Sequence, residues 1–143
     1  MKKWYLVPFM LAIVLLAVGC SSAKEEIPPA TESEIYALSG SEAFEKYLEV
    51  KDVATREDYY YIMVYIKSLP GEFASLEDAL VQTNSFSKNF LESVVKILNR
   101  YDINENVSVW IQLPLKDGGV SVLGHTEYDA KSKTIHDFER YKP

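Results

Sequence analysis

Three residues near the C-terminus have a spacing that suits a metal site. His125, Glu127 and Asp129 are each separated by one residue, so on a β-strand they would share a face at steps of about 6.7 Å. Imidazole and carboxylate groups bind divalent metals, and His136 and Asp137 are close in the sequence. The alternative is a polar sheet face that ends in a turn at Asp129. We favour this alternative and expect neither a metal nor a cofactor.

Ser85 and Lys88 form a second pair with chemical potential. They lie in Ser85-Phe86-Ser87-Lys88, which resembles the S-x-x-K pattern of penicillin-recognising serine enzymes. In that family the serine attacks the substrate and the lysine helps to activate it. The S-D-N and K-T-G elements of the family are absent from this sequence. We therefore expect a helix cap followed by a solvated lysine, and no catalytic residue.

Aromatic residues form the third candidate. Tyr59, Tyr61 and Tyr65 alternate along one segment, and Trp110 and His125 fall on one face of a predicted hairpin. Tyr and Trp combine apolar area with a polar group, which favours them in binding surfaces. If both segments belong to one sheet, these five side chains form a candidate binding face.

Hydrophobic periodicity predicts the elements that position these residues. Alternation predicts a strand over residues 59–68 and a hairpin over about residues 107–128, with Asp117-Gly118 as its turn. An apolar stripe predicts the main helix over about residues 86–101. With a two-residue turn, the hairpin pairs Ser108 with Glu127, Val109 with Thr126, Trp110 with His125, Gln112 with Leu123, and Leu113 with Val122.

Weaker patterns precede the first strand. The spacing of Phe44, Tyr47 and Leu48 predicts a helix over residues 40–50, and the polar residues 51–58 indicate a loop. This helix, or the loop that precedes the main helix, could cover the aromatic face as a second core layer. We favour this covered arrangement over an open face, because the three apolar residues need a packing partner.

Together these elements predict an α+β fold with a small, mainly antiparallel sheet of three to four strands. The sheet comprises the strand over residues 59–68, the hairpin and a weakly indicated last strand over residues 134–138. The helix over residues 86–101 is expected to pack on the aliphatic face. A signal helix and a flexible tether are expected before the domain.

The first twenty residues end at Cys20, the only cysteine in the chain. Lys2 and Lys3 precede an uncharged run over residues 4–18, which is shorter than the roughly 20 residues that a permanent span needs. Ala17-Val18-Gly19-Cys20 resembles the lipobox of bacterial lipoprotein precursors. The resemblance implies diacylglycerol on the Cys20 sulfur, cleavage before Cys20, and acylation of the new amino terminus, for example with palmitate. The alternative is an uncleaved signal anchor with an incidental cysteine.

The sequence thus predicts three regions: a cleaved signal peptide over residues 1–19, a lipidated cysteine with a flexible tether over residues 20–34, and one globular domain over residues 35–143. Without residues 1–19 the chain carries 13 Lys and Arg against 21 Asp and Glu, a net charge of −8. Such an acidic domain is not expected to bind nucleic acid or anionic lipid, so the acyl chains must provide the membrane anchor.

The expected function is therefore that of a lipid-anchored module on the extracytoplasmic face of the cell membrane, which binds an envelope protein or a small ligand. The alternative is a small surface hydrolase or metal-dependent enzyme that uses the face of His125 and Glu127. The sequence has no recognisable nucleophile–base pair and no Gly-rich phosphate loop, and it has two histidines. These features favour the binding module over the enzyme.

Overall fold

The computed structural model describes residues 25–68 and 74–143. Within these residues, two α-helices and a short 3-10 helix accompany a six-stranded sheet. In chain order the elements are α2 (Pro29–Ala37), η1 (Leu38–Gly40), β1 (Leu48–Thr55), β2 (Tyr60–Ile66), α3 (Leu76–Arg100), β3 (Val107–Pro114), β4 (Val120–Asp129), β5 (Thr134–Ile135) and β6 (Glu139–Arg140).

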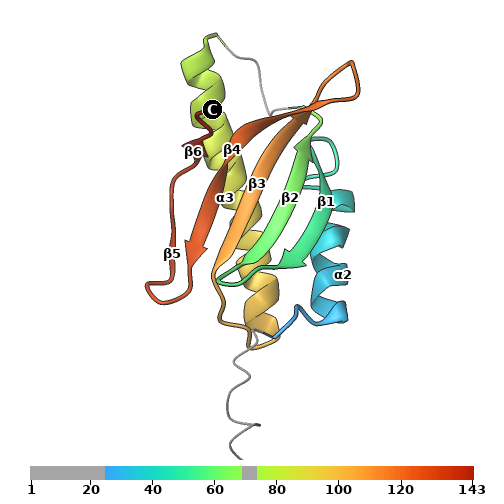
Figure 1. Ribbon diagram of the computed structural model, residues 1–143, viewed down its shortest axis with the longest axis vertical. Helices are drawn as coiled ribbons and strands as arrows, with labels where there is room; N and C mark the ends of the chain where they lie inside the picture. The colour runs from blue at the N-terminus through green and yellow to red at the C-terminus, as the bar shows by residue number, and fades with distance from the viewer. Residues whose placement is uncertain (1–24, 69–73) are drawn as a thin grey trace, which may run out of the picture.

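The sheet has the strand order β1-β2-β3-β4-β5, and β6 also pairs with β4 (Figure 1). Two antiparallel pairs, β1 with β2 and β3 with β4, are joined by a parallel pair of β2 and β3 at the centre. Parallel neighbours need a crossover connection, and α3 is the helix of that connection. The predicted α+β class is confirmed, but the sheet is mixed and has more than the three to four strands expected.

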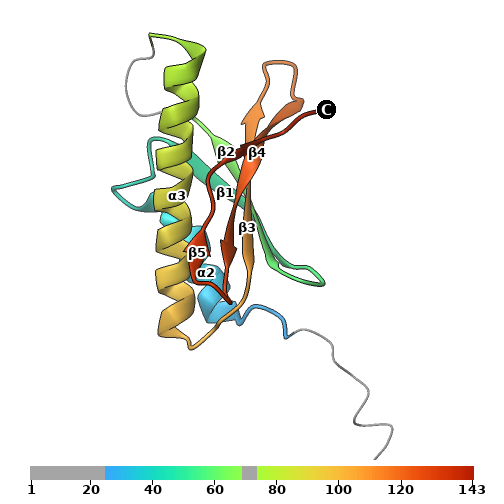
Figure 2. The same cartoon turned by 90° about the vertical axis from the view of Figure 1, so that its left-hand side faces the viewer.

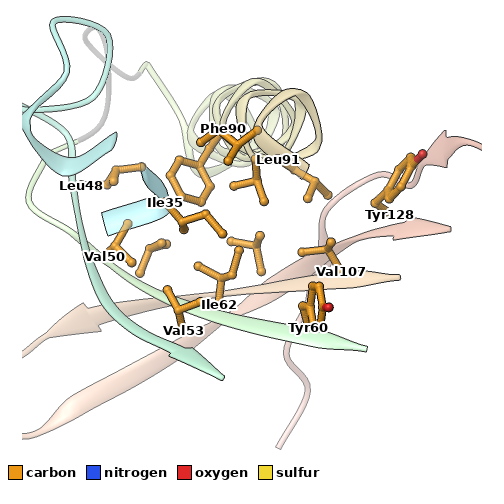
Figure 3. Close-up of a cluster of buried hydrophobic side chains, with 14 of the residues drawn as sticks. Ile35, Leu48, Val50, Val53, Tyr60, Ile62, Phe90, Leu91, Val107 and Tyr128 are labelled. Carbon is orange, nitrogen blue, oxygen red and sulfur yellow. The ribbon is translucent and has the colours of Figure 1, made fainter. Parts of the chain in front are cut away.

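Both helices lie on one side of the sheet, and the hydrophobic core fills the space between the two layers (Figure 2). Along β2 the buried positions alternate with half-buried ones, so one face of the strand points to the helices. Figure 3 shows Ile62 of this strand pointing toward Phe90 and Leu91 of α3 and Ile35 of α2. The aliphatic face of residues 59–68 thus meets the main helix, as the sequence predicts.

The helix α3 begins ten residues earlier than the periodicity predicts. Ser75 is its N-cap, and the Ser75 Oγ accepts a hydrogen bond from the Asp78 backbone N–H at 3.1 Å. Asn84, deep inside the helix, accepts a hydrogen bond from the Phe138 backbone N–H at 2.8 Å through its Oδ1 atom. The polar stretch of α3 therefore includes a side chain that holds the C-terminal segment.

The helix predicted over residues 40–50 and the loop predicted over residues 51–58 are both wrong. Turns over residues 41–47 lead directly into β1. The Phe44 ring still packs edge-on against the rings of Phe86 and Phe90, at centroid distances of 5.8 and 5.4 Å. The apolar residues of this segment are buried as expected, but turns and a strand present them instead of a helix.

The prediction of a flexible tether is wrong for residues 25–34. Pro29 occupies the first turn of α2, where a missing N–H group costs nothing. Ile27, Thr31 and Ile35 are buried, although their polar neighbours give the segment almost no apolar stripe. The signal peptide and Cys20 lie outside the described residues.

The segment around α2 also protects the outer edge of β1. Backbone N–H groups of that edge donate to side chains instead of to another strand: Val50 donates to the Ser39 Oγ at 2.7 Å, and Val53 donates to the Tyr36 hydroxyl at 3.2 Å. An edge whose N–H groups are occupied is a poor template for pairing with another chain. These two hydrogen bonds explain why the segment around the short α2 is part of the fold.

The hairpin of β3 and β4 confirms the predicted pairs nearest its open end, including Trp110 with His125. The predicted two-residue turn is wrong, because Leu115 and Gly119 close a three-residue loop whose last residue, Gly118, has a φ of 86°. A bulge in β4 then compensates for the longer loop. Between turn and bulge the register differs from the prediction: Gln112 pairs with Val122, and Leu113 pairs with Ser121.

The contribution of α2 to the fold can be tested at Ile35. Ile35→Ala should lower the free energy of unfolding by about 2–5 kcal/mol, because it leaves a cavity between α2, β1 and α3. Ser33→Ala changes an exposed position of the same helix and should stay within about 0.5 kcal/mol of the original protein. Chemical denaturation of both variants measures the difference. Equal stabilities would show that α2 does not belong to the folded core.

Candidate functional site

The candidate site is the face of the sheet that points away from the helices, called the outer face below. Strand pairing places Asp52, Met63, Trp110, His125 and Glu139 in one row across β1, β2, β3, β4 and β6. Figure 2 shows α2 and α3 on the opposite side of the sheet. Among the described residues, no helix covers this row.

The covered arrangement that the sequence favoured is therefore wrong for the described part of the chain. Tyr47, which was expected to help cover the aromatic face, packs its ring against Phe86 of α3 at 5.7 Å. Phe44 packs against the same helix. Both rings bury their apolar area on the helical side, so they leave the outer face open.

Trp110 and His125 form the centre of the outer face. Their rings are stacked, with centroids 4.7 Å apart and planes 18° from parallel. The Trp110 Nε1 donor has no acceptor among the described residues. The His125 Nε2 atom lies 3.5 Å from the Glu127 Oε1 atom and 3.9 Å from the Glu139 Oε2 atom. The centre is thus an aromatic pair with two carboxylates beside it.

Two tyrosines extend this aromatic surface along β2. The Arg56 guanidinium lies over the Tyr61 ring at 5.0 Å, and the Lys51 ammonium lies over the Tyr65 ring at 5.2 Å. Both distances suit cation–π attraction. Burial raises the pKa of the Tyr61 hydroxyl, and the nearby Asp52 carboxylate adds to this effect. Tyr61 therefore remains a neutral, polar-tipped aromatic group at physiological pH.

The structure brings together four of the five residues predicted for the binding face. Tyr59 is the exception, since it precedes β2 and lines a pocket of about 280 Å³ whose wall also includes Ser108 and Glu127. Sequence analysis did not include Met63 among the binding residues, although it alternates with Tyr61 and Tyr65. It also missed Glu139, which reaches the face through the pairing of β6 with β4, and no local pattern indicates that pairing.

Of the His125, Glu127 and Asp129 triplet, Asp129 is held in a turn. Asp129 accepts hydrogen bonds from the Lys131 backbone N–H and the Ser132 hydroxyl, both at 2.9 Å, and these bonds lower the pKa of its carboxyl group. The turn that sequence analysis favoured is present. Within residues 25–68 and 74–143, no three His, Cys, Asp or Glu side chains are grouped as metal ligands.

Ser85 and Lys88 do not form a nucleophile and its activator. Ser85 is exposed on α3. The Lys88 Nζ atom is paired with the Asp137 Oδ1 atom at 2.8 Å, and this contact lowers the pKa of Asp137. The lysine therefore holds the segment between β5 and β6 against the helix.

Comparison with known proteins gives no further constraint on function. No protein-family model matches the chain, and neither the curated proteins nor the solved structures give a match.

No helix in the described part of the chain is both long and apolar enough to cross a membrane.

The pairing of Lys88 with Asp137 predicts a measurable titration. Because the pKa of Asp137 is lowered in the folded state, its contribution to stability is complete above its unfolded pKa of about 3.9 and is lost as the pH falls through the lowered value. Lys88→Met should raise the pKa of Asp137 toward its ordinary value. The shift will be partial, because Asn84 also donates a hydrogen bond to this carboxylate.

An NMR titration of the Asp137 carboxyl carbon measures this shift. Lys131→Met removes an exposed lysine at a distant turn and should leave the Asp137 titration unchanged. An Asp137 pKa that is the same with and without the Lys88 ammonium would contradict the pairing.

Proposed function

We propose that this protein is a bacterial lipoprotein whose domain binds an envelope protein or a small ligand through the outer face of its sheet. The observation that carries this proposal is the open aromatic surface around the stacked Trp110 and His125 rings. Acyl chains on Cys20 hold the domain at the extracytoplasmic face of the cell membrane.

The composition of the outer face supports a role in binding. Protein interfaces are enriched in Tyr, Trp, Met and Arg at their centre and have a polar rim. Here Trp110, Met63 and the two tyrosines of β2 form the centre, and charged side chains such as Asp52 and Glu127 lie around them. A polar rim of both signs suits recognition of one partner by complementary charges.

The short connection to Cys20 supports a position close to the membrane. Ile27 is the first buried side chain of the described residues, so six residues separate it from Cys20. Six residues reach at most about 20 Å when fully extended. The lipobox resemblance, the basic start and the short apolar run support the anchor itself.

The alternative of a hydrolase or a metal-dependent enzyme has no support from the described side chains. His125 is stacked on Trp110 and faces carboxylates, and Lys88 is paired with Asp137. Neither arrangement places a general base beside a nucleophile. Binding is therefore the function that this geometry supports best.

Lipidation is tested at Cys20. Mass spectrometry of the mature amino terminus should show two or three acyl chains on a chain that starts at Cys20, because dual acylation gives stable membrane anchoring. Cys20→Ser should abolish both the modification and the cleavage, while Ser21→Ala should preserve them. A mature chain that starts elsewhere, or an unmodified Cys20, would refute the anchor.

Binding through the outer face is tested at Trp110. Trp110→Ala should lower the free energy of unfolding by less than about 3 kcal/mol, because Trp110 lies outside the buried core. Phe90→Ala, which removes a fully buried ring, should cost about 3–5 kcal/mol. Denaturation curves of the two variants give this comparison.

A photo-crosslinking amino acid at position 65 should then capture the partner in living cells, and the capture should disappear in Trp110→Ala. The same amino acid at Glu92, on the exposed side of α3, should capture nothing specific. Capture at position 92 alone, or a core-sized stability loss for Trp110→Ala, would contradict a binding role for this face.

A further inference from the structure

A second surface lies on the helical side of the sheet, where the first turns of α3 approach the β3–β4 hairpin. A groove of about 380 Å³ opens there. Its apolar wall includes Leu80 of α3, Leu113 of β3, Leu123 of β4 and Phe138, which precedes β6. None of these side chains belongs to the outer face.

The apolar surface continues from the groove toward the tip of the hairpin. Leu113 is 38% exposed, and beyond it Leu115 is 44% exposed. Large exposed apolar side chains beside a groove are typical of binding surfaces. The groove therefore suits a ligand with an apolar part.

Among the described residues, cations and no carboxylates line the groove. Lys67 and Arg140 are the charged residues of this described wall, although the whole chain has 21 acidic residues against 15 basic ones. The Lys67 ammonium donates one hydrogen bond to the Glu45 backbone carbonyl at 3.0 Å and keeps further donors. Arg140 has no ion-pair partner within the described residues. An anionic group is the natural complement of these two side chains.

The groove lies far from the point where the chain enters the domain. The carbonyl of Glu25 contacts the Tyr60 hydroxyl at the start of β2, whereas the groove includes Ile66 at the end of that strand. Figure 1 shows the start of the described chain beside the C-terminal end of α3, and the helix spans about 37 Å. If Cys20 anchors the protein as proposed above, the groove lies at the end of the domain opposite the anchor, which favours a free ligand over the bilayer itself.

We propose that this groove binds a free, single-chain anionic amphiphile such as a fatty acid. The alkyl chain lies among Leu80, Leu113, Leu123 and Phe138, and the carboxylate pairs with Arg140 and Lys67. The volume of about 380 Å³ is at the lower end of small-molecule pockets, which suits one alkyl chain better than a two-chain lipid.

Photoaffinity labelling of the full-length protein in its own membranes tests this proposal. A medium-chain fatty acid with a photoreactive diazirine near its tail is added in solution, and the adducts are mapped by mass spectrometry of peptides. The adducts should concentrate on the peptides that contain Leu80 and Leu123. The corresponding neutral primary amide should label these peptides about tenfold less, because it loses the charged hydrogen bonds.

Arg140→Glu should reduce labelling by the acid about tenfold and leave labelling by the amide nearly unchanged. Lys131→Glu makes the same charge change at an exposed distant turn and should affect neither probe. Leu123→Trp, which fills the groove, should reduce labelling by both probes. Adducts spread over the whole chain, equal labelling by acid and amide, or a response to Lys131→Glu equal to that of Arg140→Glu would overturn the proposal.

This outcome is independent of the function proposed for the outer face. Trp110→Ala should leave labelling of the groove unchanged whether or not the outer face binds a partner, because Trp110 lies on the other side of the sheet. A loss of groove labelling in Trp110→Ala would also contradict a separate amphiphile site.

Discussion

The parallel pairing of β2 with β3 is the contact on which the rest of the structure depends. Parallel neighbours need a crossover, and α3 must pack on one face of the sheet to complete it. Ile62 of β2 and Val109 of β3 are adjacent on that face and are fully buried, and each such side chain contributes about 1.5–3 kcal/mol when it leaves water. Because the side chains of a strand alternate, the same pairing places Met63 beside Trp110 on the opposite face.

The edges of the sheet are closed by elements from the two ends of the described chain. The segment around α2 occupies N–H groups of β1, and β5 and β6 pair with β4. Gly124 permits the close approach of β6, because a Cβ atom at this position would lie 2.1 Å from the Glu139 carbonyl oxygen. Exposed edges invite pairing between chains, so their protection directs recognition to the faces of the sheet.

The two proposed binding surfaces differ because they arise from different causes. The outer face is open because α2 and α3 both pack against the opposite face of the sheet. Its aromatic residues lie on regular strands. The groove forms where the bulged end of the β3–β4 hairpin meets the first turns of α3 and where Phe138 enters from the C-terminal segment. A flat aromatic surface suits a macromolecular partner or a flat ligand, whereas a narrow apolar groove with two cations suits a single amphiphile.

Periodicity by itself determined the α+β class, the buried face of residues 59–68, the core of the main helix and the pairing of Trp110 with His125, because these depend on local alternation and on turn chemistry. The lipobox resemblance of residues 1–20 is likewise a property of the sequence alone. Tertiary contacts decided the rest. Ile35 makes α2 a structured element although its neighbours are polar, and Phe44 is buried from a turn instead of a helix. Glu139 joins the outer face, and Phe138 joins the groove, only through the return of the chain along β4. Such placements depend on which distant residue each side chain meets, and no local spacing encodes that.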